Sequence, residues 1–292
     1  MIDFILVAVA FLWTLFATAS DIKTREVPDW LNYSLVAIGI GLRAIYSIAS
    51  KEWTFLLYGI AGLFAFFLVG NFLYYTRQWG GGDAKLLMGY GVVFGSYPDT
   101  LLGYFNPNLN MPFIAIILIN ILLVGAVCGL VYSVVLAAKN KEKFLKEIKR
   151  LGKSKEFIKN GKLVVVVSAA AFIINLFFIN ANIKIILYLF ALFALLFYII
   201  FLFIKSVENI AMYKKVRIEK VTEGDWIANN VVVNGRVVYR PERTGITKRN
   251  IMMLKRLKVK NVVVREGIPF VPSFFIALII SLIWGNLFAY VI

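Results

Sequence analysis

Long apolar runs alternate with short polar or basic stretches along most of the chain. A run of about 20 apolar residues is long enough to cross a bilayer as an α-helix. The pattern predicts an all-α polytopic membrane protein with about eight transmembrane helices, one of them short: residues 2–20, 30–49, 54–75, 84–94, 112–138, 163–179, 183–204 and 273–292. The short run, 84–94, carries small residues that suit close packing between helices, namely Gly89, Gly91 and, just after it, Gly95.

Two polar stretches interrupt this alternation. Residues 139–162 are rich in lysine, with apolar residues at helical spacing, and predict a basic cytoplasmic or interfacial helix. Residues 205–271 contain a hairpin signal at Asn234-Gly235, and Thr247 is placed to cap a helix, so a small cytoplasmic α+β domain is predicted there. The predicted parts are a membrane domain 1–138, the basic segment 139–162, a helical hairpin 163–204, the α+β domain 205–271 and a C-terminal transmembrane helix 272–292.

Composition agrees with a membrane protein: of 292 residues, 61% are hydrophobic, and the mean hydropathy is +0.81. The net charge is +16. If the N-terminus lies outside, alternation of the spans puts every Lys and Arg on the cytoplasmic side except Arg43, Lys51 and Lys184. This asymmetry follows the positive-inside rule, so the basic excess needs no nucleic-acid partner. Arg43, within the second helix, is predicted to extend its side chain to the outer surface.

Histidine is absent, and Cys128 is the single cysteine. These counts exclude Ser-His-Asp and Cys-His catalysis, His-ligated zinc and an intrachain disulfide. We therefore expect no metal and no cofactor, and proton transfer in any hydrolytic reaction would fall to carboxylates or lysines.

Two carboxylates are predicted to meet at one membrane face. Asp21 ends the first helix, and Asp83 follows Gly80, Gly81 and Gly82 at the start of the fourth, so alternation puts both on the cytoplasmic side. Each aspartate alone has a simpler explanation: Asp21 could be an ordinary polar residue at the start of a loop, and Asp83 could be a helix N-cap. Together, two close carboxylates share a proton: one can activate water while the other protonates the leaving group. This pair predicts aspartyl-protease chemistry.

Gly80, Gly81 and Gly82 would let a substrate backbone approach Asp83 closely, so they are candidates for supporting the pair or binding substrate. Three basic residues nearby are further candidates for these roles: Lys85, Lys23 and Arg25. For each, an interfacial role beside lipid head groups is the alternative. Asp29 is predicted to cap the second helix.

The stretch Gly80-Gly81-Gly82-Asp83-Ala84-Lys85-Leu86-Leu87 resembles the GxGD-x-K-L signature of the type IV prepilin peptidase family. Residues 21–29 are similar to the first-aspartate segment of that family, and 223–226 and 265–272 resemble its archaeal preflagellin and prepilin peptidase branch. The resemblance implies a multi-pass aspartic-type endopeptidase of the cell membrane, with Asp21 and Asp83 as a cytoplasmic dyad. Its partners would be the lipid bilayer and precursors of pilins or archaellins, from which it removes a short basic leader.

Bacterial members of that family carry a cysteine-rich domain and also N-methylate their product. The chain leaves no room for such a domain between residues 29 and 51, so peptidase activity without methyl transfer is expected. Two other functions stay open from sequence: a transporter or channel with interfacial carboxylates, and a non-catalytic scaffold for pilus assembly. Acidic residues at one interface, rather than at the midplane, favour the protease.

Overall fold

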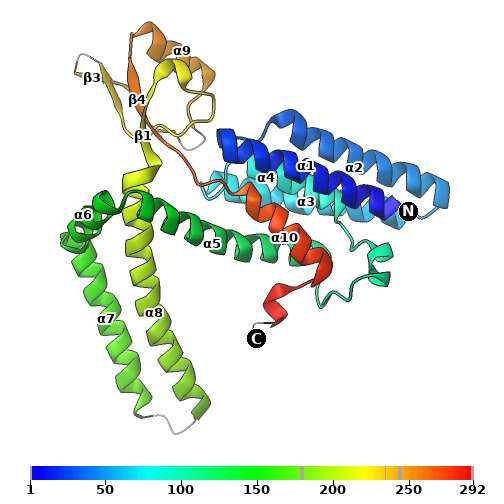
Figure 1. The fold of residues 1–292 in the computed structure, drawn as a ribbon, viewed down its shortest axis with the longest axis horizontal. Coiled ribbons are helices and arrows are strands. Elements are labelled where there is room, and N and C mark those ends of the chain that lie inside the picture. Colours follow the sequence, from blue (N-terminus) through cyan, green and yellow to red (C-terminus); the bar gives the residue numbers. More distant parts are fainter. Residues whose placement is uncertain (1, 178–180, 234, 243–244, 291–292) are drawn as a thin grey trace. The chain divides into compact units, whose positions relative to one another are not determined.

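The computed structural model describes residues 2–177, 181–233, 235–242 and 245–290 (Figure 1). The chain divides into two compact units, which we describe separately. The first comprises Met1–Gly129 with Lys215–Ile292, and the second comprises Leu130–Lys214.

In the described part of the chain, six helices are long and apolar enough to cross a membrane. They are α1 (Ile2–Thr24), α2 (Asp29–Ser50), α3 (Trp53–Tyr75), α5 (Phe113–Lys139), α7 (Lys155–Asn175) and α8 (Ala181–Val207). Their outer surfaces carry many exposed large apolar side chains, as lipid contact requires. The prediction of a polytopic helical membrane protein is confirmed.

Two further apolar helices are short. Helix α4 (Gly81–Val93) matches the predicted short element, whereas α10 (Val271–Ile283) stops well before the predicted span 273–292 does. The chain breaks at Gly285, which has a left-handed φ of 74° and whose Cβ position is filled by the backbone of Asn108. It then makes the turn η4 (Leu287–Tyr290), and residues 291–292 lie outside the described residues. A full C-terminal span was therefore a wrong prediction.

Helix α4 lies inside the bundle of the first unit. It packs against α2 and α3, and also contacts α1, while α1 packs against α10 (Figure 1). Glycines bring α3 and α4 into backbone contact: a Cβ on Gly62 would overlap the carbonyl of Gly91, and one on Gly91 would overlap that of Gly62. The small residues of the fourth helix thus serve the predicted close packing.

Arg43 does not reach the outer surface, so that prediction was wrong. Its side chain is 1% exposed and lies between helices. The guanidinium donates to the carbonyls of Val93, at 2.9 Å, and Phe55, and its Cζ lies 4.2 Å from the centre of the Phe55 ring. A helix of 13 residues is about 20 Å long, shorter than a hydrocarbon core of about 30 Å. Arg43 therefore donates a hydrogen bond to a carbonyl in the last turn of α4, which water in a bilayer core would not supply.

The predicted α+β domain forms a core of its own. Strands β1 (Tyr213–Arg217) and β4 (Asn261–Arg265) pair, and β2 (Val231–Val233) pairs antiparallel with β3 (Arg236–Tyr239). The short 3₁₀ turn η3 (Ile218–Lys220) follows β1, and α9 (Lys248–Arg256) lies between β3 and β4. Thr247 caps α9 by accepting the Asn250 N–H at 3.3 Å, as predicted. The hairpin is confirmed, although Asn234 in its turn lies outside the described residues. The buried core residues are Ile218, Val221, Ile227, Tyr239, Ile246, Ile251, Leu254, Val262 and Val264.

The second unit holds the helical hairpin α7–α8, the basic helix α6 (Lys141–Gly152) and the turn η2 (Glu208–Met212). Residues 139–162 were predicted as one helical segment, but the chain breaks at Lys153. Ser154 then caps α7 by accepting the N–H of Phe157 at 3.4 Å. Within α6, Arg150 donates twice to Glu147, at 2.8 and 2.6 Å, which holds the pKa of that carboxyl below its usual range.

Replacing a packed glycine tests the α3–α4 contact. We expect Gly62→Ala to lower the free energy of unfolding by about 1–3 kcal/mol, because the two backbones must separate. Gly41→Ala, on α2, is the matched control, since its Cβ would meet nothing within 4 Å. Unfolding of both purified variants in detergent measures the difference, and equal stability of the two would contradict the contact.

Replacing Arg43 tests whether its guanidinium stabilises the C-terminal end of α4. Arg43→Met leaves the Val93 carbonyl without its donor, so we expect a loss of about 1–3 kcal/mol in the same unfolding measurement. Lys51→Met, at an exposed position, serves as the control. A smaller loss for Arg43→Met than for Lys51→Met would show that the buried guanidinium is dispensable.

Candidate active site

Asp21 lies in the last turn of α1 and is 6% exposed. Its Oδ2 accepts the backbone N–H of Val271, the first residue of α10, at 2.9 Å, and the N–H of Phe270 also bonds to this carboxylate. Arg25, the residue after the end of α1, has a left-handed φ of 62° and places its positive charge near the same group. The first aspartate is thus held by backbone donors from the far end of the sequence.

Asp83 lies in the first turn of α4 and is half-buried. Its Oδ2 accepts the N–H of Gly80 at 3.0 Å, which satisfies one donor at the start of that helix. The glycine turn packs against the segment that follows Asp21: a Cβ on Gly82 would approach Val27 at 3.1 Å, and Asn32 donates to the Gly82 carbonyl at 3.4 Å. Absence of a side chain at this position lets the two aspartate segments meet.

A buried hydrogen bond sets the register between the two helices that carry the aspartates. The hydroxyls of Thr14 on α1 and Tyr90 on α4 lie 2.9 Å apart. Each residue is two helical turns from the aspartate on its own helix, so the two carboxylates come to the same end of the bundle. They are close enough for their negative charges to interact.

The basic candidates make different contacts. Lys85 pairs with Asp29 at 2.6 Å, and its ammonium lies 5.5 Å from the centre of the Tyr33 ring. Lys23 is exposed, and Arg25 is the one whose charge acts on Asp21. Asp29 is the first residue of α2 rather than its cap, which is Pro28, so its capping role was a wrong prediction.

The small α+β domain reaches the loop after Asp21. Thr222 donates through its hydroxyl to Glu26 at 2.8 Å and through its N–H to Asp225 at 2.8 Å. Burial raises the pKa of Asp225, and the negative charges of Glu26 and Glu266 add to the effect. The domain therefore makes a polar contact with the first-aspartate segment.

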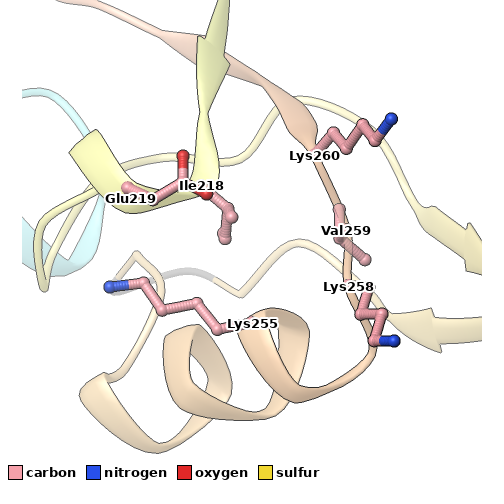
Figure 2. Close-up of a pocket in the computed structure, with 6 residues that line it drawn as sticks. All are labelled: Ile218, Glu219, Lys255, Lys258, Val259 and Lys260. Carbon is pink, nitrogen blue, oxygen red and sulfur yellow. The ribbon is translucent and has the colours of Figure 1, made fainter.

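A separate shallow pocket lies in this domain and does not include the aspartate pair (Figure 2). Its lining residues are Ile218, Glu219, Lys255, Lys258, Val259 and Lys260. Lys258 and Lys260 extend away from Lys255 (Figure 2), so the three ammonium groups do not converge on one point.

The arrangement suits acid–base chemistry by two carboxylates at helix ends. Within the described residues, no three acidic, histidine or cysteine side chains gather to hold a metal ion. Sequence reasoning missed the donors at Phe270 and Val271 and the buried Thr14–Tyr90 bond. The Thr14–Tyr90 bond could have been found, because both are polar residues within apolar runs, seven positions from the aspartate on the same helix. No local sequence signal indicated the donors at Phe270 and Val271.

Comparison with known proteins agrees with the two aspartate motifs. Residues 8–135 match the type IV leader peptidase family. The chain is 28% identical over 145 residues to a preflagellin peptidase of Methanococcus voltae, covering 48% of this chain and 62% of that relative. It is 33% identical over 97 residues to a preflagellin peptidase of Methanocaldococcus jannaschii, covering 33% of this chain and 40% of the relative.

A prepilin peptidase of Methanothermobacter thermautotrophicus is 34% identical over 91 residues, which is 30% of this chain and 22% of the relative. The chain thus spans less than two thirds of the length of each of these relatives. No solved structure matches the chain. The match to the type IV leader peptidase family includes both aspartates, Asp21 and Asp83.

Proposed function

We propose that the protein is a membrane aspartic endopeptidase that removes the short basic leader from type IV pilin-like or archaellin precursors. The observation that carries this proposal is that Asp21 and Asp83 lie at the same end of the α1–α4 pair, near enough for their charges to interact, and that each accepts a backbone N–H. The matching relatives named preflagellin and prepilin peptidases support the same class of substrate.

The chemistry needs only the pair and water. The ionised carboxylate takes a proton from the attacking water, and the protonated one donates to the carbonyl oxygen or the leaving amine of the scissile peptide. The two groups then exchange roles before the next cycle. No metal, cofactor or methyl donor enters the cleavage.

The active site is proposed to face the cytoplasm, with the N-terminus outside. The lysine-rich distribution along the chain supports this orientation. The leader of the precursor would then meet Asp21 and Asp83 where its own apolar segment enters the bilayer.

Lys85 is proposed to hold α4 to the start of α2, rather than to take part in cleavage. Its ammonium is committed to Asp29 and lies over the Tyr33 ring, away from Asp83 on its own helix. Lys23, Gly80 and Gly81 stay candidates for substrate contact, Lys23 because it is exposed and the glycines because they carry no side chain beside Asp83. Gly82 packs against Val27 instead.

Removal of either carboxylate tests the proposed function. Asp21→Asn and Asp83→Asn should each reduce cleavage of a precursor by at least about 10²–10⁴-fold, the usual contribution of a general acid or base. Asp29→Asn, at another carboxylate near the same end, should stay close to wild type. The assay is gel-resolved processing by purified protein in liposomes, with a panel of pilin and archaellin precursors. Full processing by both variants would overturn the proposal.

A double-mutant cycle tests the role of Lys85. We expect a coupling of about 0.2–1 kcal/mol between Lys85→Met and Asp29→Asn in unfolding, because Asp29 is largely exposed. The coupling should shrink as salt is raised. Cleavage by Lys85→Met should fall less than about tenfold, the equivalent of 1.4 kcal/mol. A larger loss of cleavage with unchanged stability would place Lys85 at the substrate instead.

A further inference from the structure

We propose that the N-terminus of α10 is a positioning element for the aspartate pair. The Val271 N–H fixes the carboxylate of Asp21, and the contact between Phe270 and Trp79 ties this donor to the glycine turn of Asp83. This inference rests on the proposed protease function. It adds to the site a segment that lies outside the family match at residues 8–135.

The donors come from parts of the backbone that a helix leaves unpaired. The first N–H groups of a helix have no partner within it, and Pro272, the second residue of α10, has no N–H at all. The Val271 N–H is therefore available, and Asp21 accepts it at 2.9 Å in a buried position. Gly80 does the same for Asp83 at 3.0 Å from the residue before α4.

Aromatic rings connect these two donors. The ring of Trp79, next to Gly80, lies 5.2 Å from that of Phe270, next to Val271, and 5.4 Å from that of Phe274. Trp79 is 5% exposed, so it packs in the protein rather than facing the membrane surface. The rings are tilted against one another, by 49° and 57°, and such aromatic contacts favour a defined geometry. Because each ring belongs to the residue before a donor, a shift of α10 would move both carboxylate contacts together.

A second contact, two turns from Asp83 along α4 and less than one turn from Val271 along α10, fixes the direction of α10. The hydroxyl of Tyr90, already bonded to Thr14, lies 3.3 Å from the carbonyl of Phe274, and the two rings are 5.6 Å apart. The helix is thus attached to α1 at the Asp21 carboxylate, to the glycine turn through Trp79, and to α4 again at Tyr90. A displacement of about 1 Å at such a site can cost about 10²-fold in rate.

The same segment joins the site to the small α+β domain. Strand β4 ends at Arg265 and leads through residues 266–269 into Phe270, as the orange ribbon in Figure 1 shows. Thr222 of that domain contacts Glu26, five residues after Asp21. The domain is therefore connected through the chain to the start of α10 and contacts the loop after Asp21 through a hydrogen bond.

A labelling experiment tests the Asp21 contact without reference to activity. Phe270-Val271 is the single Phe-Val step in the sequence, so ¹³C-carbonyl phenylalanine with ¹⁵N-valine yields one amide signal in a carbonyl-filtered spectrum. We expect this signal to move on Asp21→Asn and to stay in place on Asp29→Asn. An unmoved signal on Asp21→Asn would overturn the proposed contact, even if the protein cleaves precursors.

Kinetics test the positioning role. Phe270→Leu and Trp79→Leu should each lower kcat by about tenfold or more with KM within twofold, while Trp79→Phe restores most of kcat. Tyr46→Leu is the matched control, because it removes a 4.9 Å aromatic contact with Phe55, away from the aspartates. If Phe270→Leu and Trp79→Leu lose only as much stability as Tyr46→Leu and keep their kcat, the aromatic contact stabilises the fold but does not position the aspartates.

The outcomes separate the two proposals. Wild-type protein that cleaves no precursor would overturn the protease, and the amide signal would still report the Asp21 contact. Cleavage that is lost in Asp21→Asn but unchanged in Phe270→Leu and Trp79→Leu would keep the protease and overturn the positioning role of α10.

Discussion

The enclosure of the short helix α4 is the constraint on which the first unit depends. Its backbone approaches α3 so closely that Gly62 and Gly91 leave no space for a side chain on either helix. Polar groups at the ends of a helix this short cannot all reach water and must find partners in the protein. Arg43 supplies a partner at one end, and the Asp83 carboxylate takes the Gly80 N–H at the other. Asp83 is therefore part of how α4 begins as well as part of the proposed site.

Both aspartates are bound through the same physical device, the unpaired N–H at the start of a helix. Such donors point along the helix axis and favour a negative charge nearby. At Asp83 the donor comes from Gly80, the residue just before its own helix, whereas at Asp21 it comes from α10, 250 residues further along the chain. A local motif can encode the first contact, but the second exists only after the whole first unit has folded.

This difference explains how far the sequence allowed prediction. Alternation of apolar runs placed Asp21 and Asp83 at one face, because the sidedness of helix ends follows from counting spans. It also marked α4 as short. It failed for Arg43, because a single basic residue in an apolar run looks the same whether it extends to lipid head groups or binds carbonyls inside the bundle. It failed for the C-terminal span, because the pairing of Gly285 with Asn108 is a long-range contact that hydropathy does not encode.

The family match ends at residue 135, before α10 begins. Residues 8–135 contain both carboxylates and the Thr14–Tyr90 bond that sets their register, so this part carries the chemistry proposed. Trp79 also lies inside the match, yet its aromatic partners, Phe270 and Phe274, lie outside it. Trp79 is a large side chain, and its ring would border a cavity if no other element packed against it. The buried carboxylate of Asp21 needs hydrogen-bond donors. The matched region therefore has two requirements that α10 meets, and a relative that lacks a corresponding helix must meet them with a different segment.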